Sequence, residues 1–181
     1  MTPARAEGPS PAVFLDRDGT IMRDVEYCAD PNQIELFDGV VDALRKLKGA
    51  GFKLFVITNQ SGIGRGYFTE QEYRAVESEL NRKLGVDLID ATYFCPDEPG
   101  KDSPRRKPAP EMVLEAARDH DLDLERSFFI GDKAIDIDCG RNAGVRTVLV
   151  QTGYGCSQEC AADWTAENLS AAAEIVLGQT R

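Results

Sequence analysis

The sequence predicts an α/β fold in which a parallel, doubly wound sheet is covered by helices on both faces. Short continuous apolar runs such as Phe52–Thr58 are typical of strands buried on both sides. These runs alternate with stretches that place apolar residues at helical spacing. The 181 residues, 42% of them hydrophobic, suffice for one core but not for two full domains. We therefore expect a single domain over residues 12–181, preceded by a disordered leader over residues 1–11.

The first half of the chain is expected to hold three strands and two helices. Glycines at 49 and 51 end the first helix, and Thr69 with Glu72 forms a capping box that opens the second. In chain order, the expected elements are a strand at Ala12–Asp16, a helix from about Asp38 to Leu47, a strand at Phe52–Thr58, a helix from Thr69 towards Leu84 and a strand at Ala91–Cys95.

The second half continues the alternation after a long loop. Residues Pro96–Pro110 contain several prolines and a glycine, so they read as a loop, and a loop of this length suggests a functional role. The expected elements that follow are a helix from about Ala109 to His120, a strand at Ser127–Asp132, a helix near Ile135–Asn142, a strand at Arg146–Val150 and a closing helix over about Thr165–Leu177.

Charge and cysteine content narrow the possible partners and location. A net charge of −10 opposes the approach of nucleic acid, and no apolar run approaches the roughly 20 residues that span a bilayer. The five cysteines are odd in number and form no Cys-x-x-Cys pair, which favours a reducing cytoplasm. Cys156 and Cys160 are four apart and could share a helical face, but no histidine lies near them to complete a metal site. A domain of this size is consistent with a monomer.

Three of the expected strands end in a compact polar residue. Asp16 follows Val13–Leu15, Thr58 ends its strand, and Asp132 follows Phe128–Gly131. One such aspartate alone is more often a turn or a helix cap. Because ligands of open parallel sheets bind beyond the carboxyl ends of the strands, the three together predict one site.

The segment Asp16-Arg17-Asp18-Gly19-Thr20 places two carboxylates two residues apart, so that one can bind metal or attack while the other handles protons. This segment resembles the first motif of the haloacid dehalogenase (HAD) superfamily of phosphatases. The later motifs are also present in order: Thr58, Lys107 within Arg105–Pro108, and Gly131–Asp132 with Asp136. The resemblance extends over residues Val13–Gly155.

The resemblance implies a Rossmann-like HAD fold and a set of roles. Asp16 would attack phosphorus, and Asp18 would act as general acid and then general base. Thr58 and Lys107 would hold the phosphoryl oxygens. Mg²⁺ would be bound by Asp16, Asp132 and the backbone carbonyl of Asp18.

Within that superfamily the chain is similar to the D-glycero-D-manno-heptose 1,7-bisphosphate phosphatases and the related histidinol-phosphate phosphatases. The similarity rests mainly on the stretch Thr58–Phe68 and on Arg106-Lys107-Pro108. It implies a capless domain with short inserts and a small phosphorylated sugar as substrate, here the 7-phosphate of the heptose bisphosphate. The implied substrate contacts are Asp24, Tyr27, Asn59, Gln60, Ser61, Arg106 and Lys133.

Other functions stay open at this stage. Histidinol phosphate is the nearest competing substrate, because the motifs engage the phosphoryl group and not the group that leaves. A DNA 3′-phosphatase is disfavoured by the acidic charge. A catalytically silent phospholigand-binding protein would not need to keep Asp16 and Asp132 together.

The chain departs from that group in its long loop. The group carries Cys-x-His and Cys-x-Cys there, which together hold Zn²⁺. Here the corresponding segments read Cys95-Pro96-Asp97 and Ser103-Pro104-Arg105, so one of four ligands remains. We therefore expect no structural zinc.

Overall fold

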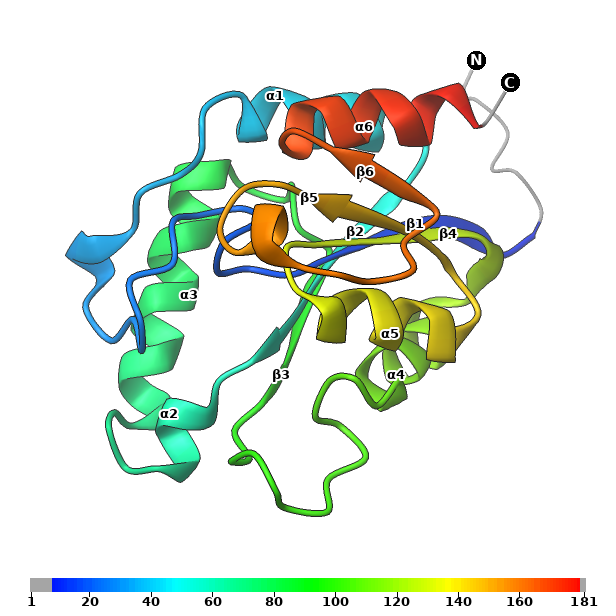
Figure 1. The fold of residues 1–181 in the computed structure, drawn as a ribbon. Coiled ribbons are helices and arrows are strands. Elements are labelled where there is room, and N and C mark those ends of the chain that lie inside the picture. The colour runs from blue at the N-terminus through cyan, green and yellow to red at the C-terminus, as the bar shows by residue number, and fades with distance from the viewer. Residues whose placement is uncertain (1–7, 180–181) are drawn as a thin grey trace.

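A computed structural model describes residues 8–179 of the chain. Its centre is a six-stranded sheet with strand order β3-β2-β1-β4-β5-β6, and every neighbouring pair of strands is parallel (Figure 1). The order reverses at β1, since the chain first builds outward through β2 and β3 and then returns to add β4 on the other side. This arrangement confirms the predicted doubly wound parallel sheet.

The elements follow the predicted alternation. The strands are β1 (Ser10–Leu15), β2 (Lys53–Asn59), β3 (Ala91–Cys95), β4 (Leu122–Gly131), β5 (Arg146–Val150) and β6 (Trp164–Ala166). The helices are α1 (Val40–Gly49), α2 (Ser61–Gly64), α3 (Glu70–Leu84), α4 (Glu111–His120), α5 (Ala134–Ala143) and α6 (Leu169–Gly178), with 3-10 turns η1 (Pro31–Gln33) and η2 (Gly155–Ser157).

Two hydrophobic clusters fill the two faces of the sheet. Strand β1 shows the division, because Val13 and Leu15 belong to one cluster while Ala12 and Phe14 belong to the other. The first cluster packs under α1, α3 and α6, and the second under α4 and α5 (Figure 1). All four of these β1 residues are fully buried, which explains why a continuous apolar run, and not an alternating one, marks the central strand.

The structure differs from the predicted boundaries at both ends of the chain. Strand β1 begins at Ser10, whose backbone N–H donates to the Asp121 carbonyl at 3.1 Å, so Ser10 and Pro11 belong to the sheet and not to a leader. Of the remaining expected leader, residues 1–7 lie outside the described residues. Strand β4 is also longer than predicted, because its first residues pair with Ser10 and Pro11.

The predicted closing helix was wrong in its first turn. Thr165 and Ala166 lie in β6, which pairs with β5 through Leu149 and Val150, and α6 begins only at Leu169. Three residues show no periodicity, so this strand depends on its neighbour. The side chain of Asn168 caps α6 by accepting from the Ala171 N–H at 3.0 Å.

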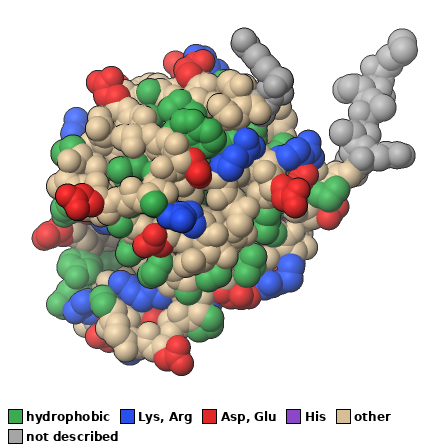
Figure 2. Space-filling model, turned by 45° about the vertical axis from the view of Figure 1, so that its right-hand side comes forward, with side chains coloured by type: hydrophobic (Ala, Val, Ile, Leu, Met, Phe, Trp, Pro, Cys, Tyr) green, Lys and Arg blue, Asp and Glu red, His purple; other side chains and the backbone are tan. Residues whose placement is uncertain are grey.

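Across residues 8–179 we find no helix with the length and apolarity that a bilayer crossing requires. Acidic and basic side chains are interspersed on the face that Figure 2 shows, so the net charge of −10 is not gathered there into one patch.

Candidate active site

The candidate site lies at the carboxyl ends of β1, β2 and β4, where the strand order reverses. Asp16 directly follows β1, Asp132 directly follows β4, and Thr58 is the penultimate residue of β2. Because β1 pairs with both β2 and β4 in parallel register, the three strand ends meet as the sequence predicted.

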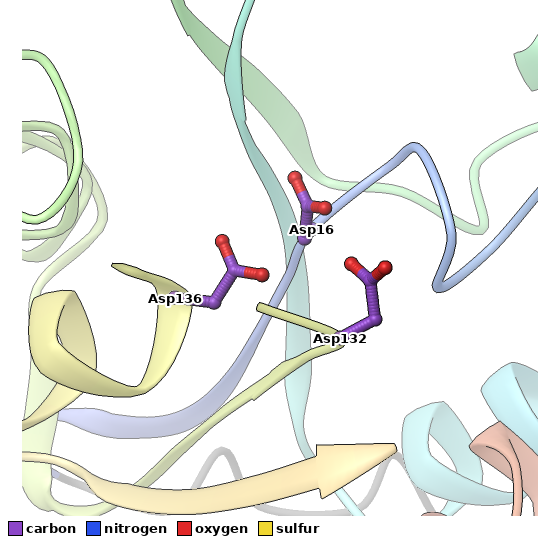
Figure 3. A group of neighbouring side chains, drawn as sticks. All are labelled: Asp16, Asp132 and Asp136. Atoms are coloured by element: carbon purple, nitrogen blue, oxygen red, sulfur yellow. The ribbon is translucent and has the colours of Figure 1, made fainter. Parts of the chain in front are cut away.

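Three carboxylates converge at this point (Figure 3). Asp16, Asp132 and Asp136 each offer an oxygen within 4.8 Å of the others, and at most 5% of each residue is exposed. Burial, and next the negative charge of Asp136, raise the pKa of Asp16. Burial and the charge of Asp16 likewise raise the pKa of Asp132. The group therefore carries unfavourable negative charge that a bound cation would offset.

The surroundings of Asp132 fit a metal ligand. One carboxylate oxygen accepts from the Tyr154 N–H at 2.9 Å, while the other is buried without a hydrogen-bond partner. Gly19 and Gly153, both with positive φ, line this carboxylate so closely that a β-carbon at either position would clash with it. Hard oxygen ligands in a tight, partly unsatisfied setting suit Mg²⁺.

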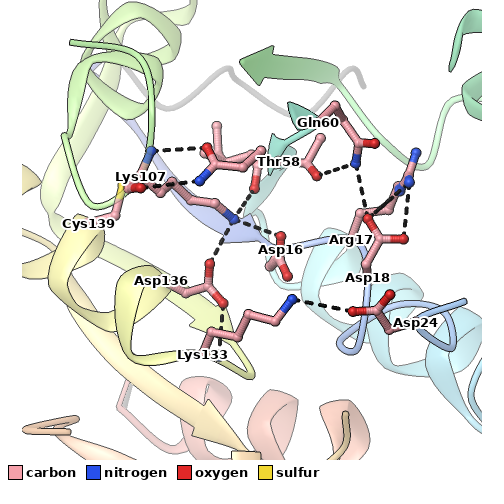
Figure 4. A network of polar contacts seen from close by, with 12 residues as sticks. Asp16, Arg17, Asp18, Asp24, Thr58, Gln60, Lys107, Lys133, Asp136 and Cys139 are labelled. Carbon is pink, nitrogen blue, oxygen red and sulfur yellow. Dashed lines mark hydrogen bonds and ion pairs between the residues drawn. The ribbon is translucent and has the colours of Figure 1, made fainter. Parts of the chain in front are cut away.

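Lys107 is held by three oxygens deep in the site (Figure 4). Its ammonium group lies 2.7 Å from Asp16 Oδ1, 2.7 Å from Asp136 Oδ1 and 2.9 Å from the Ile57 carbonyl oxygen. The Asp16 and Ile57 oxygens accept hydrogen bonds from this group, and Asp136 forms an ion pair with it. The two carboxylates, acting against burial, raise the pKa of Lys107, so its charge is retained.

The backbone of Lys107 is fixed by Asn59. The Asn59 amide accepts from the Lys107 N–H at 3.0 Å and donates to the Lys107 carbonyl at 3.2 Å. This reciprocal pair joins β2 to the loop before α4. Asn59, predicted as a substrate contact, thus fixes the backbone of Lys107, which the sequence predicted to be catalytic.

Asp136 is the residue whose role sequence reasoning missed. It occupies the first turn of α5, where it accepts from the Lys133 N–H at 3.0 Å and caps the helix. Its other oxygen pairs with Lys107. The sequence placed Asp136 with Gly131–Asp132 in the acidic motif but gave it no role.

Asp18 is held in a separate polar network. The buried Arg17 guanidinium donates to both carboxylate oxygens at 3.0 Å, and Gln60 Nε2 donates to Asp18 Oδ2 at 3.0 Å and to Thr58 Oγ1 at 2.9 Å (Figure 4). The Asp18 carboxylate lies outside the trio that could bind metal. Its expected metal contact is through the backbone carbonyl, and that contact stays a prediction.

Two adjoining cavities organise the predicted residues. An inner cavity of about 40 Å³ is lined by all four residues predicted to be catalytic: Asp16, Asp18, Thr58 and Lys107. An outer cavity of about 250 Å³ is lined by all seven predicted substrate contacts: Asp24, Tyr27, Asn59, Gln60, Ser61, Arg106 and Lys133. Asp18, Asn59, Lys133 and Ile135 line both cavities, so the two are continuous.

The five cysteines are free thiols. The expectation that Cys156 and Cys160 could share a helical face was wrong, because Cys156 lies in the 3-10 turn η2 and Cys160 lies in the loop after it.

Comparison with known proteins finds relatives along nearly the whole chain. A family model described as "HAD-hyrolase-like" matches residues 104–172. The D-glycero-D-manno-heptose-1,7-bisphosphate 7-phosphatase of Thermosynechococcus vestitus is 40% identical over 93% of this chain and 96% of its own length. The D-glycero-beta-D-manno-heptose-1,7-bisphosphate 7-phosphatase of Escherichia coli K12 is 42% identical over 88% and 90%.

A solved structure of D,D-heptose 1,7-bisphosphate phosphatase from B. bronchiseptica, complexed with magnesium and phosphate, superposes with a TM-score of 0.85. It is 31% identical and covers 93% of this chain and 99% of its own. The agreement extends from overall fold to nearly full-length sequence. The chain therefore belongs to the HAD superfamily of phosphatases, in the same family as these heptose-bisphosphate phosphatases.

Proposed function

We propose that this chain hydrolyses a phosphate monoester through a covalent phosphoryl intermediate on Asp16. The observation that carries the proposal is the convergence of Asp16, Asp18 and Lys107 on one inner cavity. Lys107 holds one oxygen of Asp16, and no described group donates a hydrogen bond to the other. That second oxygen is the proposed nucleophile.

In the first step the Asp16 oxygen forms a bond to phosphorus while the bond from phosphorus to the substrate oxygen breaks. Asp18, acting as general acid, gives a proton to the departing oxygen. In the second step Asp18 takes a proton from water as the water oxygen attacks phosphorus. Inorganic phosphate leaves and the Asp16 carboxylate is restored. Arg17 and Gln60, which donate hydrogen bonds to the Asp18 carboxylate, would orient it for both proton transfers.

Mg²⁺ would be held by Asp16, Asp132 and the Asp18 carbonyl, and when bound it would supply positive charge to the phosphoryl oxygens. The buried Asp132 oxygen without a partner supports this assignment. Thr58 lines the inner cavity and would hold a phosphoryl oxygen. The ammonium group of Lys107 contacts protein oxygens, including one of Asp16, so Lys107 would fix the position of the nucleophile.

For the substrate we propose D-glycero-D-manno-heptose 1,7-bisphosphate, cleaved at the 7-phosphate. The similarity to phosphatases named for that substrate supports it. The outer cavity adds Arg106 and Lys133, two cations that would receive the phosphate that is not cleaved. The Lys133 ammonium group forms an ion pair with Asp24 at 3.3 Å. Because Asp24 is partly exposed to solvent, Lys133 can turn to a ligand without leaving a fully buried charge unpaired.

A turnover comparison tests the substrate. Heptose 1,7-bisphosphate, histidinol phosphate and simple sugar monophosphates are assayed at equal concentration with and without Mg²⁺. We expect Mg²⁺-dependent release of phosphate and the highest kcat/KM for the bisphosphate. A higher kcat/KM for histidinol phosphate would refute the proposed substrate but not the proposed covalent mechanism.

The Asp16→Asn variant tests the nucleophile. It should lose turnover of every substrate while keeping its fold, since the amide nearly matches the carboxylate in size. The matched control is Asp138→Asn, which changes an exposed aspartate of α5. Retention of most Mg²⁺-dependent activity by Asp16→Asn would show that Asp16 is not the nucleophile.

We also propose that the long loop binds no structural zinc. Only Cys95 supplies a thiol among the four corresponding positions, and its sulfur lies 3.5 Å from Asp97 Oδ2 and 3.6 Å from Ser103 Oγ. Elemental analysis of protein purified without chelator should find less than about 0.1 equivalent of zinc. One tightly held equivalent would overturn the proposal.

We also propose that the protein is a monomer in solution and that it is located in the cytoplasm. Light scattering measures its molar mass in solution, and the mass of a dimer would contradict the proposed monomer.

A further inference from the structure

Three consecutive backbone carbonyls, those of Cys95, Pro96 and Asp97, tie together two walls of the outer cavity. The Cys95 carbonyl accepts from the Gln60 N–H at 2.7 Å, and the Pro96 carbonyl accepts from the Gly64 N–H at 3.0 Å. The Asp97 carbonyl accepts from Arg106 Nη1 at 2.7 Å. The segment Cys95–Asp97 therefore holds helix α2 on one side and the Arg106 guanidinium on the other.

The fit between this segment and α2 is close. A β-carbon on Gly64 would clash with the Pro96 carbonyl oxygen, so the helix can approach this closely only with glycine there. Ser61 and Gly62 of the same helix line the outer cavity. A shift of the segment would thus move this wall together with Arg106.

The side chain of Asp97 closes the segment on itself. Its carboxylate accepts from Cys95 Sγ at 3.5 Å, and Ser103 lies on the far side of the loop within 3.6 Å of the same sulfur. A hydrogen bond from Ser103, the largest effect, lowers the pKa of Asp97, so the group is ionised at neutral pH. One carboxylate thereby joins the end of β3 to the returning part of the loop.

The remainder of the loop has its own anchors. Arg105 donates to the Phe94 carbonyl at 3.1 Å and pairs with Glu115 of α4 at 2.8 Å. The Arg106 N–H donates to the Ser103 carbonyl at 3.3 Å. Removing the Asp97 carboxylate should therefore loosen Pro96, Asp97 and the Arg106 side chain, while Cys95 stays paired in β3.

We propose that Asp97 is a positioning residue that sets the preference for a substrate with a second anionic group. Asp97 does not line the cavity, and acts by fixing the carbonyls that hold Arg106 and α2. The inference rests on the proposed function, because it takes the Arg106 guanidinium as the receptor of the phosphate that is not cleaved.

The test compares Asp97→Ala with wild type on two substrates: heptose 1,7-bisphosphate and p-nitrophenyl phosphate, which has no second anion. We expect the KM for the bisphosphate to rise by about tenfold with kcat within twofold, and both parameters for p-nitrophenyl phosphate to stay within about twofold. Asp97→Asn, whose amide oxygen still accepts hydrogen bonds, should recover part of the KM. The matched control is Glu98→Gln, a neighbouring carboxylate that pairs only with the exposed Lys101.

A double variant tests the path of the effect. If Asp97 acts through Arg106, the double variant Asp97→Ala/Arg106→Ala should have the KM of Arg106→Ala alone. Additive effects, an equal fall in kcat on both substrates, or an unchanged KM in Asp97→Ala would each overturn the inference.

Failure of the proposed substrate can be distinguished from failure of the positioning role of Asp97. A wild-type enzyme with no preference for the bisphosphate refutes the proposed substrate. Amide hydrogen exchange then still tests the positioning role, because the Gly64 N–H, which bonds to the Pro96 carbonyl, should exchange faster in Asp97→Ala than in Glu98→Gln. Equal protection in the two variants would refute that role.

Discussion

The buried carboxylates of Asp16 and Asp132 should make the stability of the metal-free protein depend on pH. Burial, followed by repulsion from Asp136, raises the pKa of Asp16 from 3.8 to about 6. Burial, followed by repulsion from Asp16, raises the pKa of Asp132 to about 7. Each folded-state pKa lies above its unfolded value, so the folded protein holds these protons more tightly. The resulting stabilisation is full below about pH 4 and is lost as the pH rises through about 6 to 7.

The size of the effect follows from these shifts. One pKa unit corresponds to about 1.4 kcal/mol, so Asp16 alone contributes on the order of 3 kcal/mol of pH-dependent stability. The two shifts share one repulsion and are not added. Mg²⁺ at about a hundred times its dissociation constant adds about 2.7 kcal/mol, which is of the same size. The metal should therefore restore at high pH what the protons supply at low pH.

The assay is urea unfolding at about pH 5.5 and about pH 8, each with EDTA and with Mg²⁺. We expect the EDTA-treated protein to be less stable at pH 8, and Mg²⁺ to stabilise it strongly there but little at pH 5.5. Asp132→Asn removes one charge and should weaken both dependences, while groups elsewhere contribute equally to both proteins. Equal stabilisation by Mg²⁺ at the two pH values, or the same pH dependence in wild type and variant, would refute the reasoning.

Three further variants probe the site and the fold. Asp136→Asn removes one of the two carboxylates that pair with Lys107 and should lower kcat by roughly 10- to 100-fold with a smaller change in KM. An unchanged kcat would show that Asp136 has no role in turnover. Gly153→Ala forces a methyl group against Asp132 at a positive φ and should cost about 1–3 kcal/mol of stability and weaken Mg²⁺ binding measured by calorimetry, whereas Gly178→Ala, in open space, should do neither. Thr69→Ala breaks the capping box of α3 and should cost about 1 kcal/mol in urea unfolding with kcat unchanged; no loss of stability would contradict the cap.

Sequence reasoning succeeded where local pattern and sheet geometry agree. The predicted bounds of the strands Ala91–Cys95 and Arg146–Val150 match the structure, and the capping box at Thr69 opens α3 as expected. Asp16 and Asp132 come together because their strands are neighbours in parallel register. That step needed only the prediction of a doubly wound sheet.

The missed features depend on contacts distant in sequence. Strand β6 has three residues and exists through its pairing with β5. The clamp of Asn59 on the Lys107 backbone joins residues 48 apart, and no spacing rule predicts it. Asp136 was placed in the acidic motif without a role, because its second oxygen meets Lys107 only after α5 packs beside the loop.

Chemical trapping tests the covalent step on Asp16 most directly. In the Asp18→Asn variant, Asp16 can still accept the phosphoryl group from an activated ester, but residue 18 cannot activate water. The variant is mixed with p-nitrophenyl phosphate, quenched in acid and digested with trypsin. We predict that the peptide ending at Arg17 gains the mass of one phosphoryl group, and that hydroxylamine removes it and leaves a hydroxamate at Asp16. A burst of p-nitrophenol with no phosphoryl group on that peptide, or with the group on another residue, would contradict the mechanism.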